Sequence, residues 1–116
     1  MRFKEYMEKA SRTDANLGGV MDDVHYVFGM LTEIGELADV FKKNIAYGKE
    51  IDWVNVKEEI GDTLWYLANF CRKHDFDLEE ILDTNIAKLE ARYPERFTEE
   101  KAINRDLDKE RTILEK

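Results

Sequence analysis

Two pairs of carboxylates carry the clearest chemical signal in this sequence. Glu33 and Glu36 form the first pair, Glu59 and Asp62 form the second, and 22 residues separate Glu36 from Glu59. Acids three apart on a helix are surface neighbours, with about 5–6 Å between Cβ atoms, so each pair can offer two ligands to one point. Four converging carboxylates would repel one another and raise each other's pKa unless a cation neutralised them. The pattern therefore predicts a metal site on two antiparallel helices.

The ligand type predicts which metal binds. Ligation by carboxylate oxygens alone favours a hard cation, so we expect Mg²⁺, with Mn²⁺ as a substitute. A di-iron or di-manganese bundle would instead need two Glu-x-x-His motifs. The nearest approach is the single segment Asp22-Asp23-Val24-His25, in which we interpret His25 as a surface histidine or a hydrogen-bonded core histidine.

A metal held by this many acids predicts phosphoryl chemistry. A spare carboxylate can orient and deprotonate a water molecule, and Glu36 and Glu59 are the candidates for that catalytic base. The cation would contact phosphate oxygens and offset the charge that develops on the leaving group. Positive side chains must complete the phosphate cradle, and Lys43, Lys88 and Arg92 are available for it.

A solvated acidic surface is the competing interpretation of either pair alone. With 26 acids in 116 residues, chance placement gives roughly six acid pairs at this spacing, and most such pairs are solvated. The apolar flanks Met30 and Leu37 favour a position near the interior for the first pair. Gly35 and Gly61 each precede the last acid of a pair, although glycine weakens a helix. We therefore expect the two helices to approach closely at these glycines.

Helical periodicity positions the acids, and we expect an all-α fold. The first helix is predicted from about Phe3 to Arg12 and the second from soon after Gly19 to Tyr47, with Gly48 suited to the left-handed position past its end. An apolar stripe on the second helix, which we expect to be buried, comprises Val24, Val27, Phe28, Leu31, Ile34, Ala38, Phe41 and Ile45.

Further helices are predicted after residue 50. Asp52 is the expected N-cap of a third helix ending near His74, and Asp77 forms a capping box with Glu80 at the start of a fourth, which Pro94 stops. We expect one domain over 1–116, with its core at about 19–94 and a charged C-terminal segment over 95–116 that could form a short helix.

Composition excludes several classes of function. The net charge of −8 disfavours nucleic-acid binding, which requires a basic surface. No apolar run of transmembrane length occurs, and the charged N-terminus lacks the apolar core of a signal peptide. The single cysteine, Cys71, is interpreted as a small core residue and fits a reducing compartment. We therefore expect a cytoplasmic protein that binds neither nucleic acid nor membrane.

The residues around the acids resemble a known family, the MazG-like nucleotide pyrophosphohydrolases of the all-α NTP pyrophosphatase superfamily. That family has a Glu-x-x-Glu pair followed by Glu-x-x-Asp, which Glu33, Glu36, Glu59 and Asp62 match. The surrounding context is also similar, as seen in the segments Thr32-Glu33-Ile34-Gly35-Glu36-Leu37-Ala38-Asp39, Glu58-Glu59-Ile60-Gly61-Asp62-Thr63-Leu64-Trp65-Tyr66-Leu67-Ala68 and Asn85-Ile86-Ala87-Lys88-Leu89-Glu90-Ala91-Arg92-Tyr93-Pro94.

The resemblance implies Mg²⁺-dependent hydrolysis of a nucleoside triphosphate, commonly a deoxynucleotide, to the monophosphate and pyrophosphate. It implies that the four acids bind the metal, that Asn85 and Lys88 contact the substrate and, more weakly, that Arg92 does so. It also implies a four-helix-bundle-like fold with antiparallel helices, assembled as a homodimer or a dimer of dimers. Trp65, Tyr66 and His25 could stack on a base, but core packing is the expected role of the two aromatic residues.

Two alternatives remain open at this point. Within the superfamily, a phosphoribosyl-ATP pyrophosphohydrolase or an enzyme acting on modified nucleotides would use the same carboxylates, and substrate profiling separates these activities. Outside it, a non-enzymatic helical interaction module would carry the acids only as a solvated surface. Such a module should show no tight metal-dependent behaviour.

Overall fold

The computed structural model describes all 116 residues as helices and connecting segments, with no strand. This confirms the expected all-α class. Two compact units are present, Met1–Phe76 and Asp77–Lys116, and the single-domain organisation stays a prediction. In chain order the elements are α1 (Phe3–Ala10), the short 3₁₀ helix η1 (Ser11–Thr13), α2 (Val20–Tyr47), α3 (Trp53–Lys73), α4 (Leu78–Arg92), α5 (Glu99–Ile103) and α6 (Leu107–Glu115).

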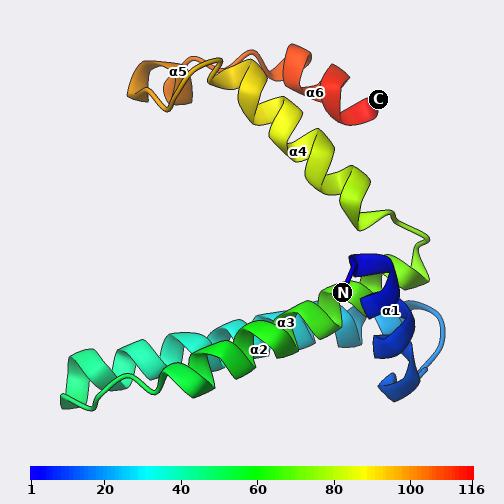
Figure 1. The fold of residues 1–116 in the computed structure, drawn as a ribbon, viewed down its shortest axis with the longest axis vertical. Coiled ribbons are helices and arrows are strands. Elements are labelled where there is room, and N and C mark those ends of the chain that lie inside the picture. The colour runs from blue at the N-terminus through cyan, green and yellow to red at the C-terminus, as the bar shows by residue number, and fades with distance from the viewer. The chain divides into compact units, whose positions relative to one another are not determined.

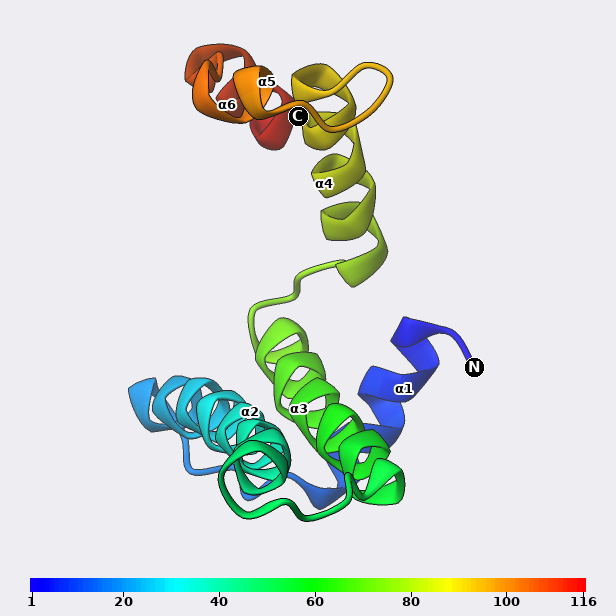
Figure 2. The ribbon, with the colours of Figure 1, turned by 90° about the vertical axis from the view of Figure 1, so that its left-hand side faces the viewer.

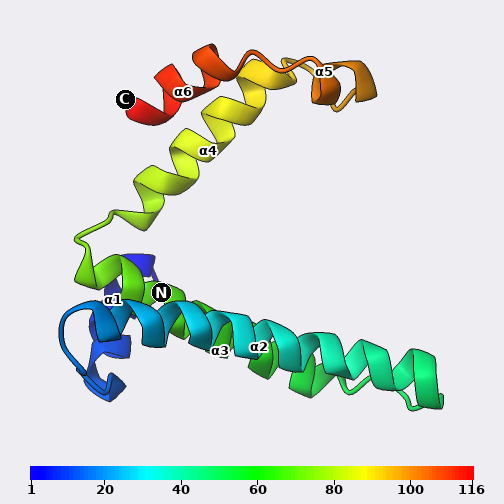
Figure 3. The same cartoon turned by 180° about the vertical axis from the view of Figure 1, so that it is seen from behind.

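The first unit is built on an antiparallel hairpin of α2 and α3, which lie side by side along their length (Figures 1 and 3). Helix α1 packs on α3, so that α3 lies between α2 and α1 (Figure 2). Gly48 ends α2 with φ of 65° in the left-handed region, as expected. Asp52 caps α3 by accepting hydrogen bonds from the backbone N–H groups of Val54 and Asn55.

The closest approach within the hairpin occurs at a glycine other than the two expected. A Cβ atom added at Gly29 would overlap the ring of Tyr66, whereas one added at Gly35 or Gly61 would meet nothing within 4 Å. The expectation of close packing at Gly35 and Gly61 was therefore wrong. The aromatic ring of Tyr66, and not a second backbone, fills the space that the glycine leaves.

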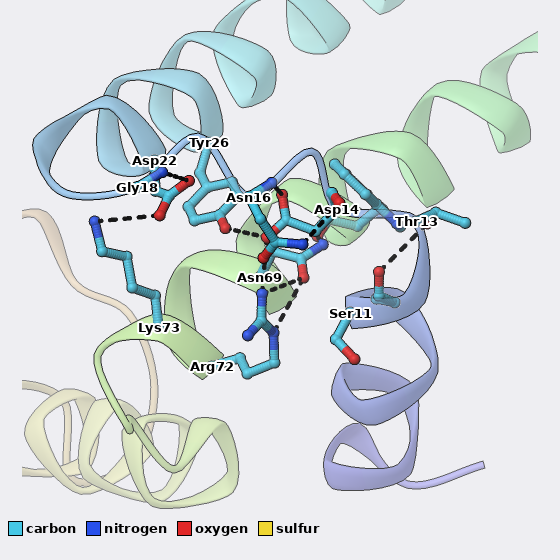
Figure 4. Close-up of polar contacts among 12 residues, drawn as sticks. Ser11, Thr13, Asp14, Asn16, Gly18, Asp22, Tyr26, Asn69, Arg72 and Lys73 are labelled. Atoms are coloured by element: carbon cyan, nitrogen blue, oxygen red, sulfur yellow. Dashed lines mark hydrogen bonds and ion pairs between the residues drawn. The ribbon is translucent and has the colours of Figure 1, made fainter.

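A buried polar network joins the segment before α2 to the end of α3 (Figure 4). The side chain of Asp14 is 0% exposed, and its Oδ2 accepts hydrogen bonds from the Tyr26 hydroxyl and from Nη2 of Arg72, the latter at 2.8 Å. Burial opposes ionisation of Asp14, but the hydrogen bonds from Tyr26 and the backbone, with the Arg72 charge, outweigh it and lower its pKa. Lys73 extends the connection by donating to the carbonyl of Gly19. The segment before α2 is thereby held against the end of α3.

Most of the apolar stripe on α2 lies exposed within the first unit, contrary to expectation. Leu31 is 67% exposed and Ile45 is 84% exposed, and the only buried residues of α2 are Tyr26 and Gly29. Helix α1 covers α3 and leaves this face of α2 without a partner inside the unit. Helical periodicity identifies which face is apolar, but it does not say which surface covers it.

These exposed apolar side chains do not amount to a membrane-crossing segment. None of the helices has both the length and the apolar character that a transmembrane span requires.

In the second unit, α4 packs against α6. Asp77 caps α4 by accepting from the backbone N–H groups of Glu79 and Glu80, and α4 ends before Pro94, both as expected. The buried Glu110 accepts hydrogen bonds from the guanidinium groups of Arg92 and Arg105, and these bonds lower its pKa to about 2. After Thr98 the chain forms two short helices, α5 and α6, where the sequence predicted a single short helix.

Gly29→Ala tests the close packing of the hairpin. The added methyl group would clash with the Tyr66 ring, and we expect the free energy of unfolding to fall by about 1–3 kcal/mol, the usual cost of overpacking a core. The control is Gly35→Ala, which meets no atom and should raise that free energy by about 0.5–1 kcal/mol through better helix propensity. Urea denaturation measures both, and equal stability of Gly29→Ala and the wild type would contradict the packing.

Candidate metal centre

The hairpin brings three of the four predicted ligands together. One carboxylate oxygen from each of Glu33, Glu59 and Asp62 lies within 4.8 Å of the others. Glu33 comes from α2 and the other two come from α3, so the antiparallel pairing of the helices creates the cluster. Glu59 is only 3% exposed, Glu33 is half-buried and Asp62 is exposed. The cluster is therefore closed on one side and open to solvent on the other.

Glu36 completes the group. The neighbouring carboxyl group of Glu59 and its negative charge raise the pKa of Glu36. The pKa of Glu59 is raised in turn by the neighbouring carboxyl group of Glu33 and by burial. Both shifts mean that the fold disfavours the ionised forms when no cation is present.

Two buried oxygen atoms at the cluster have no partner. Oε2 of Glu33 and Oε2 of Glu59 are inaccessible to solvent and accept no hydrogen bond. A buried acceptor left unsatisfied costs free energy, and an ionised one costs more. A hard divalent cation would satisfy both oxygens and offset the repulsion among the acids. The carboxylates of the cluster therefore fit the divalent cation that the sequence predicted.

The line of contact between α2 and α3, here called the seam, continues past the cluster in both directions. The residues along it differ between the two sides of the cluster. Toward the α2–α3 loop, a pocket of about 520 Å³ has Glu36 and Glu59 on its wall together with Lys43, whose ammonium group pairs with Asp39 at 2.8 Å. Glu36 from the first pair and Glu59 from the second thus both face a space large enough for a small polar ligand.

In the opposite direction the seam contains aromatic rings. The Tyr66 ring lies against Gly29 and makes edge contacts with His25, at a centroid distance of 5.5 Å, and with Trp65, at 4.9 Å. His25 is neither a surface residue nor a satisfied core residue, because it is half-buried and its buried Nδ1 atom has no hydrogen-bond partner. That interpretation of His25 was wrong.

The remaining predicted substrate-binding residues belong to α4, in the second unit. Asn85 is exposed and Lys88 is half-buried. The Arg92 guanidinium donates to Glu110, with 3.1 Å between Nε and Oε1. Their roles toward a substrate stay predictions, as does the metal-binding role of the four acids.

Sequence reasoning missed two residues beside the cluster. Lys49 and Asn55 line the pocket together with Lys43. Lys49 follows the helix-ending Gly48 in a loop, where side-chain direction has no periodicity that a sequence pattern can reveal. Asn55 could have been found, because it lies four residues before Glu59, on the same face of α3.

The all-helical fold and a paired-acid cluster that fits a divalent cation place the chain among helical proteins with a candidate metal site. Comparison with family models narrows this class, because the MazG nucleotide pyrophosphohydrolase domain matches residues 25–97. The chain therefore belongs to the MazG nucleotide pyrophosphohydrolase family. The matched segment contains the four acids and every substrate-binding residue predicted above. No curated protein and no solved structure matches the chain.

Glu59→Gln tests the metal centre without any assay of activity. At pH 7 and without divalent cations, this variant should unfold at a higher temperature than the wild type, because a buried charge whose pKa is raised has been removed. Mg²⁺ should raise the unfolding temperature of the wild type markedly and that of Glu59→Gln little. Thermal unfolding followed by circular dichroism measures both effects.

The matched control is Glu8→Gln, which removes an exposed acid from α1 of the same unit. It should keep the full stabilisation by Mg²⁺. Equal stabilisation of Glu59→Gln and the wild type by Mg²⁺ would show that the cation binds elsewhere.

Proposed function

We propose that this protein hydrolyses nucleoside or deoxynucleoside triphosphates to the monophosphate and pyrophosphate in a Mg²⁺-dependent reaction. One observation carries the proposal: the family-matched segment holds a carboxylate cluster in which Glu33 and Glu59 each keep a buried oxygen without a partner. A solvated acidic surface would not bury such atoms, so the cluster argues against the non-enzymatic module.

In this proposal the acids divide into ligands and a base. Glu33, Glu59 and Asp62 hold the cation, with Glu36 at its open side. Mg²⁺, when bound, supplies positive charge that stabilises the phosphate oxygens as negative charge develops on them. Glu36 is exposed whereas Glu59 is buried, so Glu36 is the more accessible base of the two candidates, and the neighbouring Glu59 raises its pKa above that of a free glutamate.

The proposed reaction balances without any further reactant. Glu36 accepts a proton from a water molecule, and the water oxygen forms a bond to phosphorus at the α–β linkage. The bond between that phosphorus and the bridging oxygen breaks, and its electron pair stays on the leaving phosphate oxygen. The products are the nucleoside monophosphate and pyrophosphate, and the proton on Glu36 returns to solvent.

Positive and amide side chains would bind the substrate in the same proposal. Lys43 borders the pocket next to Glu36, while Asn85, Lys88 and Arg92 are carried over from the family resemblance. Arg92 can serve although Glu110 occupies its Nε and Nη2 atoms, because a guanidinium has five N–H donors and Nη1 is not used in that ion pair.

We also propose that the chain acts as a homo-oligomer that completes a helical bundle. The support is the apolar face of α2, where Phe28, Leu31 and Ile34 are all more than half exposed within a unit that offers nothing to cover them. Exposed apolar area of this kind is typical of an interface between subunits. A second hairpin packed there would give the four-helix arrangement expected from the resemblance.

The experiment that tests the function is a pyrophosphate-release assay over the eight common ribo- and deoxynucleoside triphosphates, with Mg²⁺ or with chelator. We expect Mg²⁺-dependent formation of monophosphate and pyrophosphate, and Glu36→Gln should reduce turnover by about 100-fold or more, because a neutral amide can replace neither a charged ligand nor a base. Helical content should be unchanged in this variant.

Glu8→Gln again serves as the control and should turn over like the wild type. Normal turnover by Glu36→Gln would remove Glu36 from the site. No turnover of any of the eight nucleotides would exclude the proposed substrates and leave modified nucleotides or phosphoribosyl-ATP as the candidates.

A further inference from the structure

The pocket on the loop side of the carboxylate cluster has a role that the family match does not assign. It is a space of about 520 Å³ between the second half of α2 and the first half of α3, and Glu36, Lys43, Lys49, Asn55 and Glu59 are on its wall. Glu59 is 3% exposed and its Oε2 has no hydrogen-bond partner. The pocket therefore adjoins one of the two buried oxygens of the cluster that have no hydrogen-bond partner.

The lining of this pocket does not suit a nucleobase. Val40 is its single apolar residue, and no aromatic ring lies on its wall. A base gains much of its binding free energy by stacking on rings or apolar surfaces, at about 1–3 kcal/mol per stacked base. A polar group with several acceptor oxygens is better matched to the ammonium and amide donors of the wall.

Lys49 is well prepared to bind such a group. Its ammonium forms no ion pair, in contrast to that of Lys43, which pairs with Asp39. Its backbone is fixed, because the Asn44 side chain donates to the Lys49 carbonyl at 2.7 Å and Gly48 turns the chain in the left-handed conformation. An uncompensated charge on an ordered loop costs little further ordering when it binds an anion.

An anion can bind in this pocket only together with a cation, because six acids lie on its wall: Glu36, Asp39, Glu50, Asp52, Glu58 and Glu59. Asp39 is compensated by Lys42 at 3.3 Å as well as by Lys43. Asp52 is occupied in capping α3, and Glu36 and Glu59 face the proposed metal. A free polyphosphate would be repelled, whereas a polyphosphate bound with Mg²⁺ brings the charge that balances these carboxylates.

The other end of the seam carries aromatic rings instead of ammonium groups. Beyond Glu33 and Asp62 the Tyr66 ring fills the gap at Gly29, and further along the buried Asp14 and Arg72 close the hairpin. Rings and a buried unpartnered nitrogen are found there, and ammonium groups are found at the loop end. The two ends of the seam thus differ in the kind of group that each can bind.

We propose that the loop-side pocket binds the pyrophosphoryl group of the substrate, with Lys49 and Lys43 contacting it directly, so that the nucleotide lies along the seam with its nucleoside toward Tyr66. This inference rests on the proposed function and adds to it the direction of the substrate and a new binding residue, Lys49. The bond to be broken then lies over the carboxylate cluster.

The experiment is calorimetric titration of each product in Mg²⁺ buffer, with inorganic pyrophosphate and with deoxynucleoside monophosphates, into the wild type and Lys49→Gln. We expect Lys49→Gln to weaken binding of pyrophosphate by about tenfold, the loss typical of one charge-assisted hydrogen bond. Binding of monophosphate should stay within about twofold of the wild type. Lys49→Arg, which keeps the charge, should retain most of the affinity for pyrophosphate.

The control is Lys4→Gln, which removes an exposed lysine from α1 and should alter neither affinity. Weaker binding of monophosphate alone in Lys49→Gln would reverse the direction of the substrate and overturn the proposal. Unchanged binding of both products, or no binding of pyrophosphate by the wild type, would also overturn it. These titrations need no turnover, so a failure of the proposed hydrolysis would be recognised separately in the release assay.

Discussion

Repulsion among carboxylates held together by two helices is the interaction on which the rest of the site depends. Glu33, Glu59 and Asp62 place oxygens within 4.8 Å of one another, and Glu59 raises the pKa of the nearby Glu36. The fold tolerates this arrangement at the cost of raised pKa values and two unsatisfied buried oxygens. A divalent cation removes both costs at once, which couples metal binding to the stability of the hairpin.

The antiparallel register of α2 and α3 determines which groups lie next to the carboxylates. Because the helices run in opposite directions, residues later in α2 meet residues earlier in α3, and the seam presents a fixed order of groups. Ammonium groups lie near the loop, the acids follow, and the Tyr66 ring at Gly29 comes next. The Asp14 network then locks the register at the far end. A shift of one helical turn would separate the acids.

Local features of the fold were predictable from sequence, whereas packing partners were not. The caps at Asp52 and Asp77, the end of α2 at Gly48 and the burial of Cys71 follow from local chemistry, and the structure confirms them. The close contact at Gly29 and the exposure of the α2 stripe depend on which surfaces meet, and periodicity carries no information about that. Likewise, acid spacing indicated the cluster, but the loop residue Lys49 had no pattern to reveal it.

The central claim is that these carboxylates bind a divalent cation, and the most direct test is a crystal structure with Mn²⁺ located by its anomalous scattering. The account predicts a peak bound by carboxylate oxygens of Glu33, Glu59 and Asp62, at roughly 2.0–2.2 Å from each. A cation at that position would also bind the buried Oε2 atoms of Glu33 and Glu59, which have no hydrogen-bond partner. A peak bound by other residues, or no peak at saturating Mn²⁺, would contradict the account.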